Sequence, residues 1–454
     1  MMMCLRRQSL FIPIVFASLL QAIDSHALGL LDAYEAALEN DPVYRSAIYE
    51  NEAGQQEKKI GLSGLLPNLS ITHSQNKTTG TRKFAGQPES PLDFDSEVSS
   101  LTLRQPILNM EAVAGYRQGA ARSNSSHAKF TGHSQQLIVR LVEAYVDTLL
   151  AQDRLMLAEA QQKTLEERKK VNEQMLQKGE GTVTDVLETK SKYALAQAEV
   201  IEAQDEYEVA QLRLATIVGN KEIVQLHRLS ADFSINDLQM VDFESWQELA
   251  LNRNAELVTQ RYTVTSSKEE INKNRSGHMP RLDLVASVSR NKSASFVTAN
   301  QDVNLAAIGI EVNFPLYAGG RVNAVTNQSV ANHARAEAEL DAMTDSVLVE
   351  LRKQYQLILS SAKRIESLEL AVESAHLLVE ATEKSIQGGL RINLDLLDAQ
   401  EQLFSAQGEL SQARYNYLLA FLRLKLAAGD LVLHDLQKIA TYFDSTGRFN
   451  NVDR

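Results

Sequence analysis

Residues 389–400, GLRINLDLLDAQ, carry two carboxylates at a spacing that could do chemistry. Asp395 and Asp398 are three residues apart, and Arg391 stands four residues before Asp395. Side chains three or four residues apart share one face of a helix, so both carboxylates would point the same way. They either complement the dipole of a helix that begins here, or they form part of a site that acts on charged species.

The same arrangement occurs 210 residues upstream, because the chain is a duplication. Residues 179–190, GEGTVTDVLETK, place Asp185 and Glu188 where the later stretch has its two aspartates. A repeat of this length is a doubled domain, since solenoid units have only about 20 to 50 residues. The same offset aligns further identical residues: Gln177 with Gln387, Gly179 with Gly389, Tyr207 with Tyr417, Ala210 with Ala420, Arg213 with Arg423, and Gly219 with Gly429.

The duplication predicts the domain boundaries. We expect a signal peptide at 1–27, a first repeat at 28–219, an inter-repeat segment at 220–242, a second repeat at 243–429 and a C-terminal segment at 430–454. The leader has two arginines, a short apolar run and small residues before a cleavage point after Ala27, which is typical of secretion. A membrane anchor is the alternative reading of this run. The single cysteine, Cys4, lies in the leader, so the processed chain would have no disulfide.

The composition argues against several classes of function. A formal charge of -12 and a pI near 5.4 do not suit a nucleic-acid-binding protein, which needs a basic face. The sequence has no glycine-rich phosphate loop, no histidine spacing typical of metal sites, no nucleophile elbow and no Cys–His pair. We therefore expect no enzyme activity, no cofactor and no metal.

Two stretches without proline, 107–279 and 316–454, predict long helices, because proline breaks helix interiors. We expect one helix from about 110 to 177 and another from about 321 to 387, each on the order of 100 Å long. Leucine or tyrosine alternates with alanine every seven residues in 396–427, and a similar pattern occurs in 186–214. Each half is therefore predicted to end in an antiparallel helical hairpin that turns at 177–181 or 387–391.

Short runs with a period of two predict four β-strands, two in each half. The runs centre on Leu69, Leu101, Leu284 and Ile310, and they are joined by polar segments at 80–95 and 291–302. Runs of about ten residues could cross a bilayer in a barrel, or they could form a small soluble sheet. Four strands cannot close a barrel, so chains would have to pool them: three copies give twelve strands, and two give eight.

The ordered parts resemble the TolC family of outer-membrane channel-tunnels over essentially the whole chain. The specific motifs are FPLYAGGRV (314–322), GTVTDVLE (181–188), GGLRINLDLLDAQ (388–400) and ARYNYLLAFLRLKLAAG (413–429). GEGTVTDVLE and NRSGHMPRL (274–282) look closest to the branch that serves protein-exporting ABC transporters.

The resemblance implies a mainly α, internally duplicated fold with membrane β-strands. It implies a homotrimer, with a 12-stranded β-barrel in the outer membrane of a Gram-negative cell, continued by a coiled-coil tunnel through the periplasm. The partners would be outer-membrane lipid, an inner-membrane ABC transporter, a periplasmic adaptor and an exported protein substrate. A drug-efflux duct is the alternative within the family, and a periplasmic adaptor is the alternative from another class.

The resemblance also assigns roles to residues at the two turns and at the strand-to-helix junctions. Asp395 and Asp398 would ring the periplasmic constriction, and Arg391 would tie to Thr184 and Asp185 of a neighbouring hairpin as a latch. The family's gate tyrosine is replaced by Ile386, which puts more weight on Arg391. The turn glycines, which would contact the adaptor, are Gly179, Gly181, Gly388 and Gly389. The junction between barrel and tunnel would lie at Pro106, Pro315, Gly319 and Gly320. The plainer interpretation makes Thr182 and Asn393 helix N-caps, with Asp185 and Asp395 in the first turns.

Overall fold

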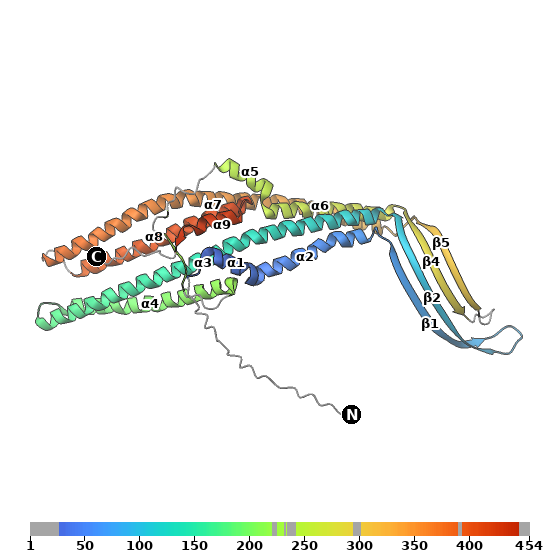
Figure 1. Ribbon diagram of the computed structural model, residues 1–454, viewed down its shortest axis with the longest axis horizontal. Helices are drawn as coiled ribbons and strands as arrows, with labels where there is room; N and C mark the ends of the chain where they lie inside the picture. Colours follow the sequence, from blue (N-terminus) through green and yellow to red (C-terminus); the bar gives the residue numbers. More distant parts are fainter. Residues whose placement is uncertain are drawn as a thin grey trace, which may run out of the picture.

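The computed structural model describes residues 27–219, 225–230, 233, 242–293, 301–388 and 393–444. The chain is highly elongated, with a curved sheet at one end and two helical hairpins pointing away from it (Figure 1). The hairpin tips therefore lie at the end of the molecule opposite the strands. None of the helices in the described ranges has an apolar stretch sufficient to cross a lipid bilayer.

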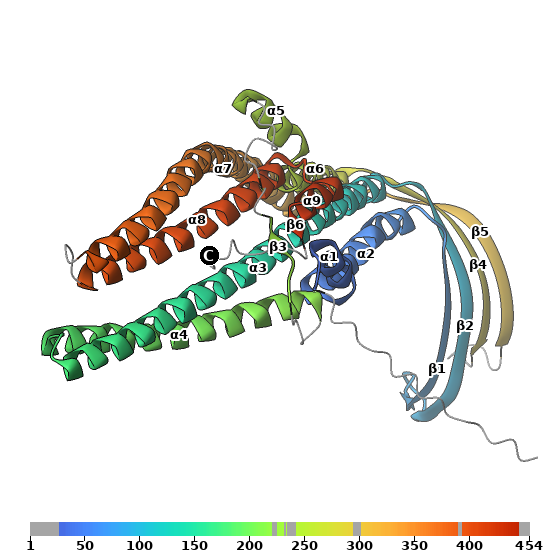
Figure 2. The same ribbon diagram turned by 60° about the vertical axis from the view of Figure 1, so that its left-hand side comes forward.

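The long helices have the predicted lengths. α3 runs from Met110 to Lys178 and α7 from Arg321 to Gln387. Each turns back into a 36-residue helix, α4 (Val183–Val218) or α8 (Asn393–Ala428), so both predicted hairpins are confirmed. Figure 2 shows the two hairpins projecting in the same direction.

The heptad positions form the seams of the hairpins, as predicted. On α8, Tyr417 is 2% exposed, and Ala420 and Leu424 are fully buried. On α7, Ile358 and Ile365 are each 1% exposed. Alanine at one of the two heptad positions that face the partner helix lets the paired helices approach closely, which explains its recurrence every seven residues.

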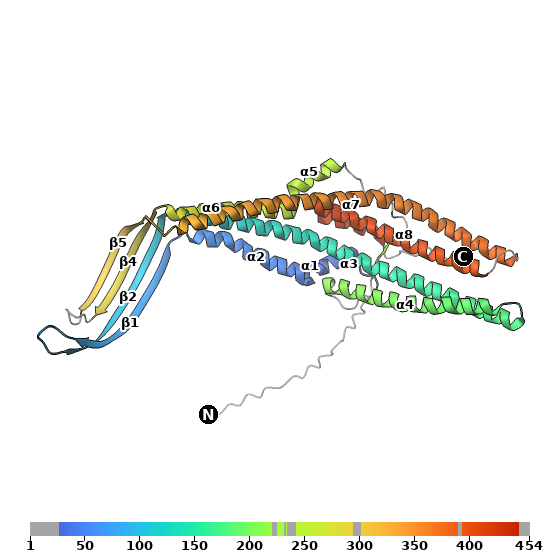
Figure 3. The same ribbon diagram turned by 180° about the vertical axis from the view of Figure 1, so that it is seen from behind.

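Shorter helices extend each half toward the sheet. The first half opens with α1 (Leu30–Asn40) and α2 (Pro42–Ser63), and the second with α5 (Phe243–Arg253), α6 (Ala255–Arg275) and a 3-10 turn at Ser276–His278. α2 and α6 lie beside α3 and α7 in the part of the molecule next to the strands (Figure 3).

The sheet contains four antiparallel strands in the order β1-β2-β4-β5. Their bounds are β1 Asn68–Arg82, β2 Ser90–Leu108, β4 Arg281–Ser293 and β5 Gln301–Asn313. The expected length of about ten residues was wrong, because the strands continue into the polar segments 80–95 and 291–302. Polar side chains are compatible with strand pairing, so hydropathy alone marked the ends too early.

The register gathers apolar side chains on one face of the sheet. Leu69 pairs with Leu103, Leu103 with Ala286, and Ala286 with Ile308. Ile71 and Ile308 on this face are 79% and 76% exposed. Within the described chain, β1 and β5 are the edges of this sheet. A single chain therefore leaves both an apolar face and two strand edges uncovered.

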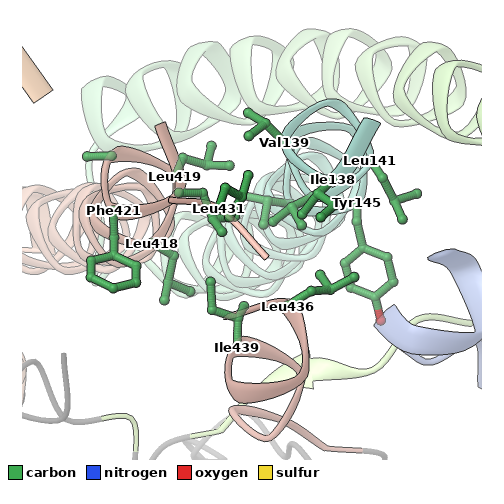
Figure 4. Packing of buried hydrophobic residues seen from close by; sticks show 14 of the residues in the cluster. Ile138, Val139, Leu141, Tyr145, Leu418, Leu419, Phe421, Leu431, Leu436 and Ile439 are labelled. Carbon is green, nitrogen blue, oxygen red and sulfur yellow. The ribbon is translucent and has the colours of Figure 1, made fainter. Parts of the chain in front are cut away.

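The main core lies in the middle of the molecule, where α3 and α8 meet (Figure 4). Leu141, Tyr145 and Leu418 are fully buried there, and Leu436 of α9 (Leu433–Ala440) packs against them. The Tyr145 hydroxyl is 2.8 Å from the Leu28 carbonyl oxygen.

A small two-stranded sheet pairs β3 (Arg228–Leu229) with β6 (Phe443–Asp444) beside this core. Neither strand was predicted from the sequence, because two-residue strands have no detectable periodicity. They join described parts of the inter-repeat and C-terminal segments, which are far apart in sequence.

Candidate functional site

The first hairpin turns on two glycines. Gly179 has φ of +77°, a left-handed conformation that favours glycine, and its N–H donates to the Leu176 carbonyl at 3.1 Å. A Cβ on Gly181 would come within 3.1 Å of the Leu176 nitrogen. Both glycines are thus explained by the geometry of the turn.

α4 begins with a capping box. The Asp185 N–H donates to Thr182 Oγ1 at 3.1 Å, and the Thr182 N–H donates to Asp185 Oδ2 at 3.1 Å. The Thr182 hydroxyl also lies 2.6 Å from the same carboxylate oxygen. The prediction that Thr182 is an N-cap is confirmed. Thr184, one residue before Asp185, is exposed at this tip.

The second turn is described only in part. α7 ends with Gly388, whose N–H donates to the Lys384 carbonyl at 3.2 Å. Gly389 and Arg391 lie outside the residues that the structure describes, so the Arg391 latch stays a prediction. α8 begins at Asn393, whose side chain lies outside the described part of the chain, so its predicted N-cap role stays a prediction.

The two predicted gate carboxylates lie in the first turns of α8 in different surroundings. Asp395 is half-buried in the first turn. Asp398 is exposed and accepts a 2.6 Å hydrogen bond from Lys192 Nζ of α4. Sequence reasoning did not identify Lys192, because the residue aligned with it in the second repeat is the uncharged Gln402.

An apolar contact joins the two hairpins next to this ion pair. Leu165 of α3, Ala196 of α4 and Leu397 of α8 form a small buried cluster, with Tyr193 packed against it. Lys169 Nζ lies 5.0 Å from the centre of the Tyr193 ring. The tip of α8 is therefore packed against the first hairpin as well as against α7.

The two hairpins differ in their buried polar groups near the tips. In the first, Asn172 Nδ2 donates to Thr189 Oγ1 at 2.8 Å, and both residues are at most 4% exposed. The residues aligned with this pair in the second hairpin are Thr382 and Ala399. Thr382 is 1% exposed, and its hydroxyl has no hydrogen-bond partner among the described residues. A hydrogen bond across the seam thus fixes the register of the first hairpin, and its counterpart is missing from the second.

The strand-to-helix junctions carry the predicted prolines and glycines. β2 shifts its register against β4 between Pro106 and Leu108, just before α3 begins. Pro315 lies in the exposed connector that leads to α7. Gly319 and Gly320 have φ of +62° and +78°, which accounts for a glycine pair at this bend.

A charged cluster spans three strands beside these junctions. Arg104 of β2 bridges Asp283 of β4 and Glu311 of β5, with both N–O distances 2.9 Å. The Asp283 side chain is 3% exposed and also accepts from Arg281 at 2.8 Å. These pairs tie the strands together on the face opposite the apolar rows.

A buried ion pair links the inter-repeat segment to the core. Arg228 of β3 contacts Asp153 of α3, and the Tyr415 hydroxyl of α8 lies 3.4 Å from the same carboxylate. Burial raises the pKa of Asp153 to about 6, against the attraction of Arg228, which lowers it. Across the described ranges, no cluster of three or more His, Cys, Asp or Glu side chains could hold a metal ion.

One known protein family accounts for both the two hairpins and the four strands of this chain. The family model described as "Outer membrane efflux protein" matches residues 33–220 and 246–430. The chain belongs to this family, the TolC family of outer-membrane channels. The two matched segments follow the two halves in which the structure repeats helix, two strands and hairpin.

Relatives at higher identity place the chain in the secretion branch of the TolC family. It is 40% identical to the alkaline protease secretion protein AprF of Pseudomonas aeruginosa, over 93% of this chain and 89% of that one. It is 38% identical to the proteases secretion protein PrtF of Dickeya chrysanthemi, over 98% and 97%. The outer membrane protein TolC of Escherichia coli is 27% identical, over 91% and 84%.

Solved structures of TolC-like channels share the fold. The outer-membrane channel OprN superposes with a TM-score of 0.76 at 20% identity, covering 88% of this chain and 90% of that one. The Campylobacter jejuni CmeC outer membrane channel gives 0.77 at 15% identity, covering 92% and 90%. The chain therefore has the TolC fold, mainly helical and with a four-stranded sheet. The family match and the relatives above make it an outer-membrane protein.

Proposed function

We propose that this chain is the exit duct of a type I secretion machine that exports a protein, with a protease as the first candidate cargo. The proposal rests on a difference in sequence identity between two groups of relatives. Two protease secretion proteins are 38% and 40% identical to this chain, whereas TolC of Escherichia coli and the efflux protein BepC of Brucella suis are 27% and 24% identical.

Three chains complete the duct. The edges β1 and β5 carry unpaired backbone groups, which cannot face lipid without a hydrogen-bond partner. Pairing β5 of one chain with β1 of the next removes every edge, and three chains give twelve strands. The exposed apolar rows that include Ile71 and Ile308 suit the lipid side of such a barrel.

The hairpin tips are the proposed periplasmic mouth. In a trimer, Asp395 and Asp398 bring six carboxylates near one constriction, where like charges concentrate cations. Arg391 would tie this turn to Thr184 and Asp185 of a neighbouring chain. The turn glycines, Gly179, Gly181, Gly388 and Gly389, are the proposed contacts for a periplasmic adaptor, and the adaptor would join the duct to an inner-membrane ABC transporter.

A drug-efflux duct is the second candidate function. The family description, "Outer membrane efflux protein", favours it, as does the outer membrane efflux protein BepC of Brucella suis at 24% identity. A cell lacking the chain separates the candidates. We expect one abundant secreted protein to disappear from the medium while antibiotic susceptibility changes little, and re-expression of the chain should restore secretion. Unchanged secretion with a marked gain in antibiotic susceptibility would favour efflux instead.

A further inference from the structure

A salt bridge joins the two hairpins of one chain close to their tips. Lys192 Nζ on α4 lies 2.6 Å from Asp398 Oδ1 on α8 and 3.8 Å from Glu401 Oε2 one turn further along. The Lys192 side chain is 25% exposed and that of Asp398 is 59% exposed. The lysine is therefore held against the protein, while the carboxylate stands at the surface of the proposed mouth.

The bridge is continuous with a buried apolar contact. Leu397, the residue immediately before Asp398, is 5% exposed and packs with Leu165 and Ala196 of the first hairpin. Moving the tip of α8 away from the first hairpin would expose Leu397 and separate Asp398 from Lys192. The two contacts therefore oppose the same motion.

Because this contact lies near the hairpin tips, it resists separation of the two hairpins more effectively than a contact at the core would. A second ion pair between the two halves, Arg423 of α8 with Glu143 of α3 at 2.7 Å, lies at the level of the central core. Asp398 is 25 residues earlier on α8, about 38 Å away along the helix axis. A small change of angle at the core moves the tips through the largest distance, so a contact at the tips has the greatest leverage on closure.

We propose that Lys192 is a positioning residue of the gate, an intrachain latch that holds the second hairpin against the first. It also offsets the charge of one of the two carboxylates that each chain contributes to the proposed ring. The inference rests on the proposed channel function. It adds a contact within one chain to the expected contact of Arg391 between chains.

The expected size of the effect follows from the exposure of the pair. One exposed ion pair favours its closed arrangement by a factor of about 1.5 to 5. If the three copies in a trimer open together, the factors multiply to between about 3 and 125. Replacing Lys192 should therefore raise the ratio of open to closed channels by at least about threefold.

Single-channel recording of full-length trimers in planar bilayers tests the latch. We expect Lys192→Gln to raise the open-to-closed ratio at least about threefold, and Lys192→Glu to raise it further, because like charges then face each other. The matched control is Lys190→Gln, at an exposed lysine on the same helix that forms no ion pair with any described residue. The control should leave the ratio at the wild-type value.

A double-mutant cycle shows whether the pair itself matters. In the Asp398→Asn background, Lys192→Gln should raise the ratio much less than it does in the wild-type background, with trimer assembly checked by native mass. The latch is wrong if Lys192→Gln behaves like Lys190→Gln, or if Lys192→Gln raises the ratio by the same factor with and without Asp398. A wild-type trimer that does not conduct would overturn the channel function and the latch together. Conduction without any effect of Lys192 would overturn the latch only.

Discussion

Two buried threonines near the hairpin tips should respond in opposite ways to the same substitution. Thr189 and Thr382 are each 1% exposed. Thr189 Oγ1 accepts from Asn172 at 2.8 Å and donates to the Asp185 carbonyl at 2.8 Å. The Thr382 hydroxyl has no partner within the described ranges, and its burial in a single chain leaves a neighbouring chain no access to it.

The expected magnitudes follow from the cost of burying polar groups. A buried hydroxyl without a hydrogen bond costs about 1 to 3 kcal/mol, and valine keeps the shape of threonine without this cost. Thr382→Val should therefore stabilise the second hairpin by about 1 to 2 kcal/mol. Thr189→Val should destabilise the first hairpin by about 1 to 3 kcal/mol, because it removes the partner of the buried Asn172 amide.

Hydrogen exchange of detergent-solubilised trimers measures these local changes. With 1.4 kcal/mol per factor of ten, exchange at the end of α7 should slow by about 5- to 30-fold in Thr382→Val. Exchange at the end of α3 should quicken by about 5- to 150-fold in Thr189→Val. Thr131→Val, at an exposed threonine of α3, is the control and should change little. If both buried substitutions shift exchange in the same direction, the account of the two seams is wrong.

Three further changes address the gate and the core. Asp395→Ala combined with Asp398→Ala should abolish block of the channel by trivalent cations from the periplasmic side, because hard multivalent ions favour clustered carboxylates. Block that persists in this double variant would exclude the proposed ring of carboxylates. Arg391→Ser should enlarge single-channel conductance without changing trimer assembly, and wild-type conductance would make this arginine an ordinary turn residue. Burial raises the pKa of Asp153 to about 6, so the unfolded chain loses this proton at lower pH than the folded chain, and stability falls as pH rises from about 4 to 6. The stability difference between wild type and Asp153→Asn should therefore change by up to about 3 kcal/mol across that pH window. Hydrogen exchange in α3 measures this difference, and a difference that stays constant with pH would contradict the burial argument.

The parts of the fold that local chemistry determines were predictable from the sequence. The absence of proline and the expected turns at 177–181 and 387–391 marked the ends of the long helices to within a residue. The spacing of seven marked the buried seams, because a coiled coil repeats its contacts at that interval. The capping box at Thr182 was readable for the same reason, since its partner is three residues away.

Contacts between distant segments were not predictable in this way. Lys192 has no charged counterpart in the second repeat, so nothing in the sequence pairs it with Asp398. The missing partner of Thr382 becomes visible only when the two hairpins are compared in three dimensions. The β3–β6 pairing joins segments more than 200 residues apart, and neither strand is long enough to show a pattern.

The central claim is that three chains pool their strands into one barrel that continues into one tunnel. The most direct test is the native mass of the detergent-extracted, processed chain, measured on the same preparation that is recorded in planar bilayers. The account predicts three times the mass of one chain, together with cation-selective conductance. A monomer or dimer that conducts would contradict it, because four or eight strands do not form the proposed barrel.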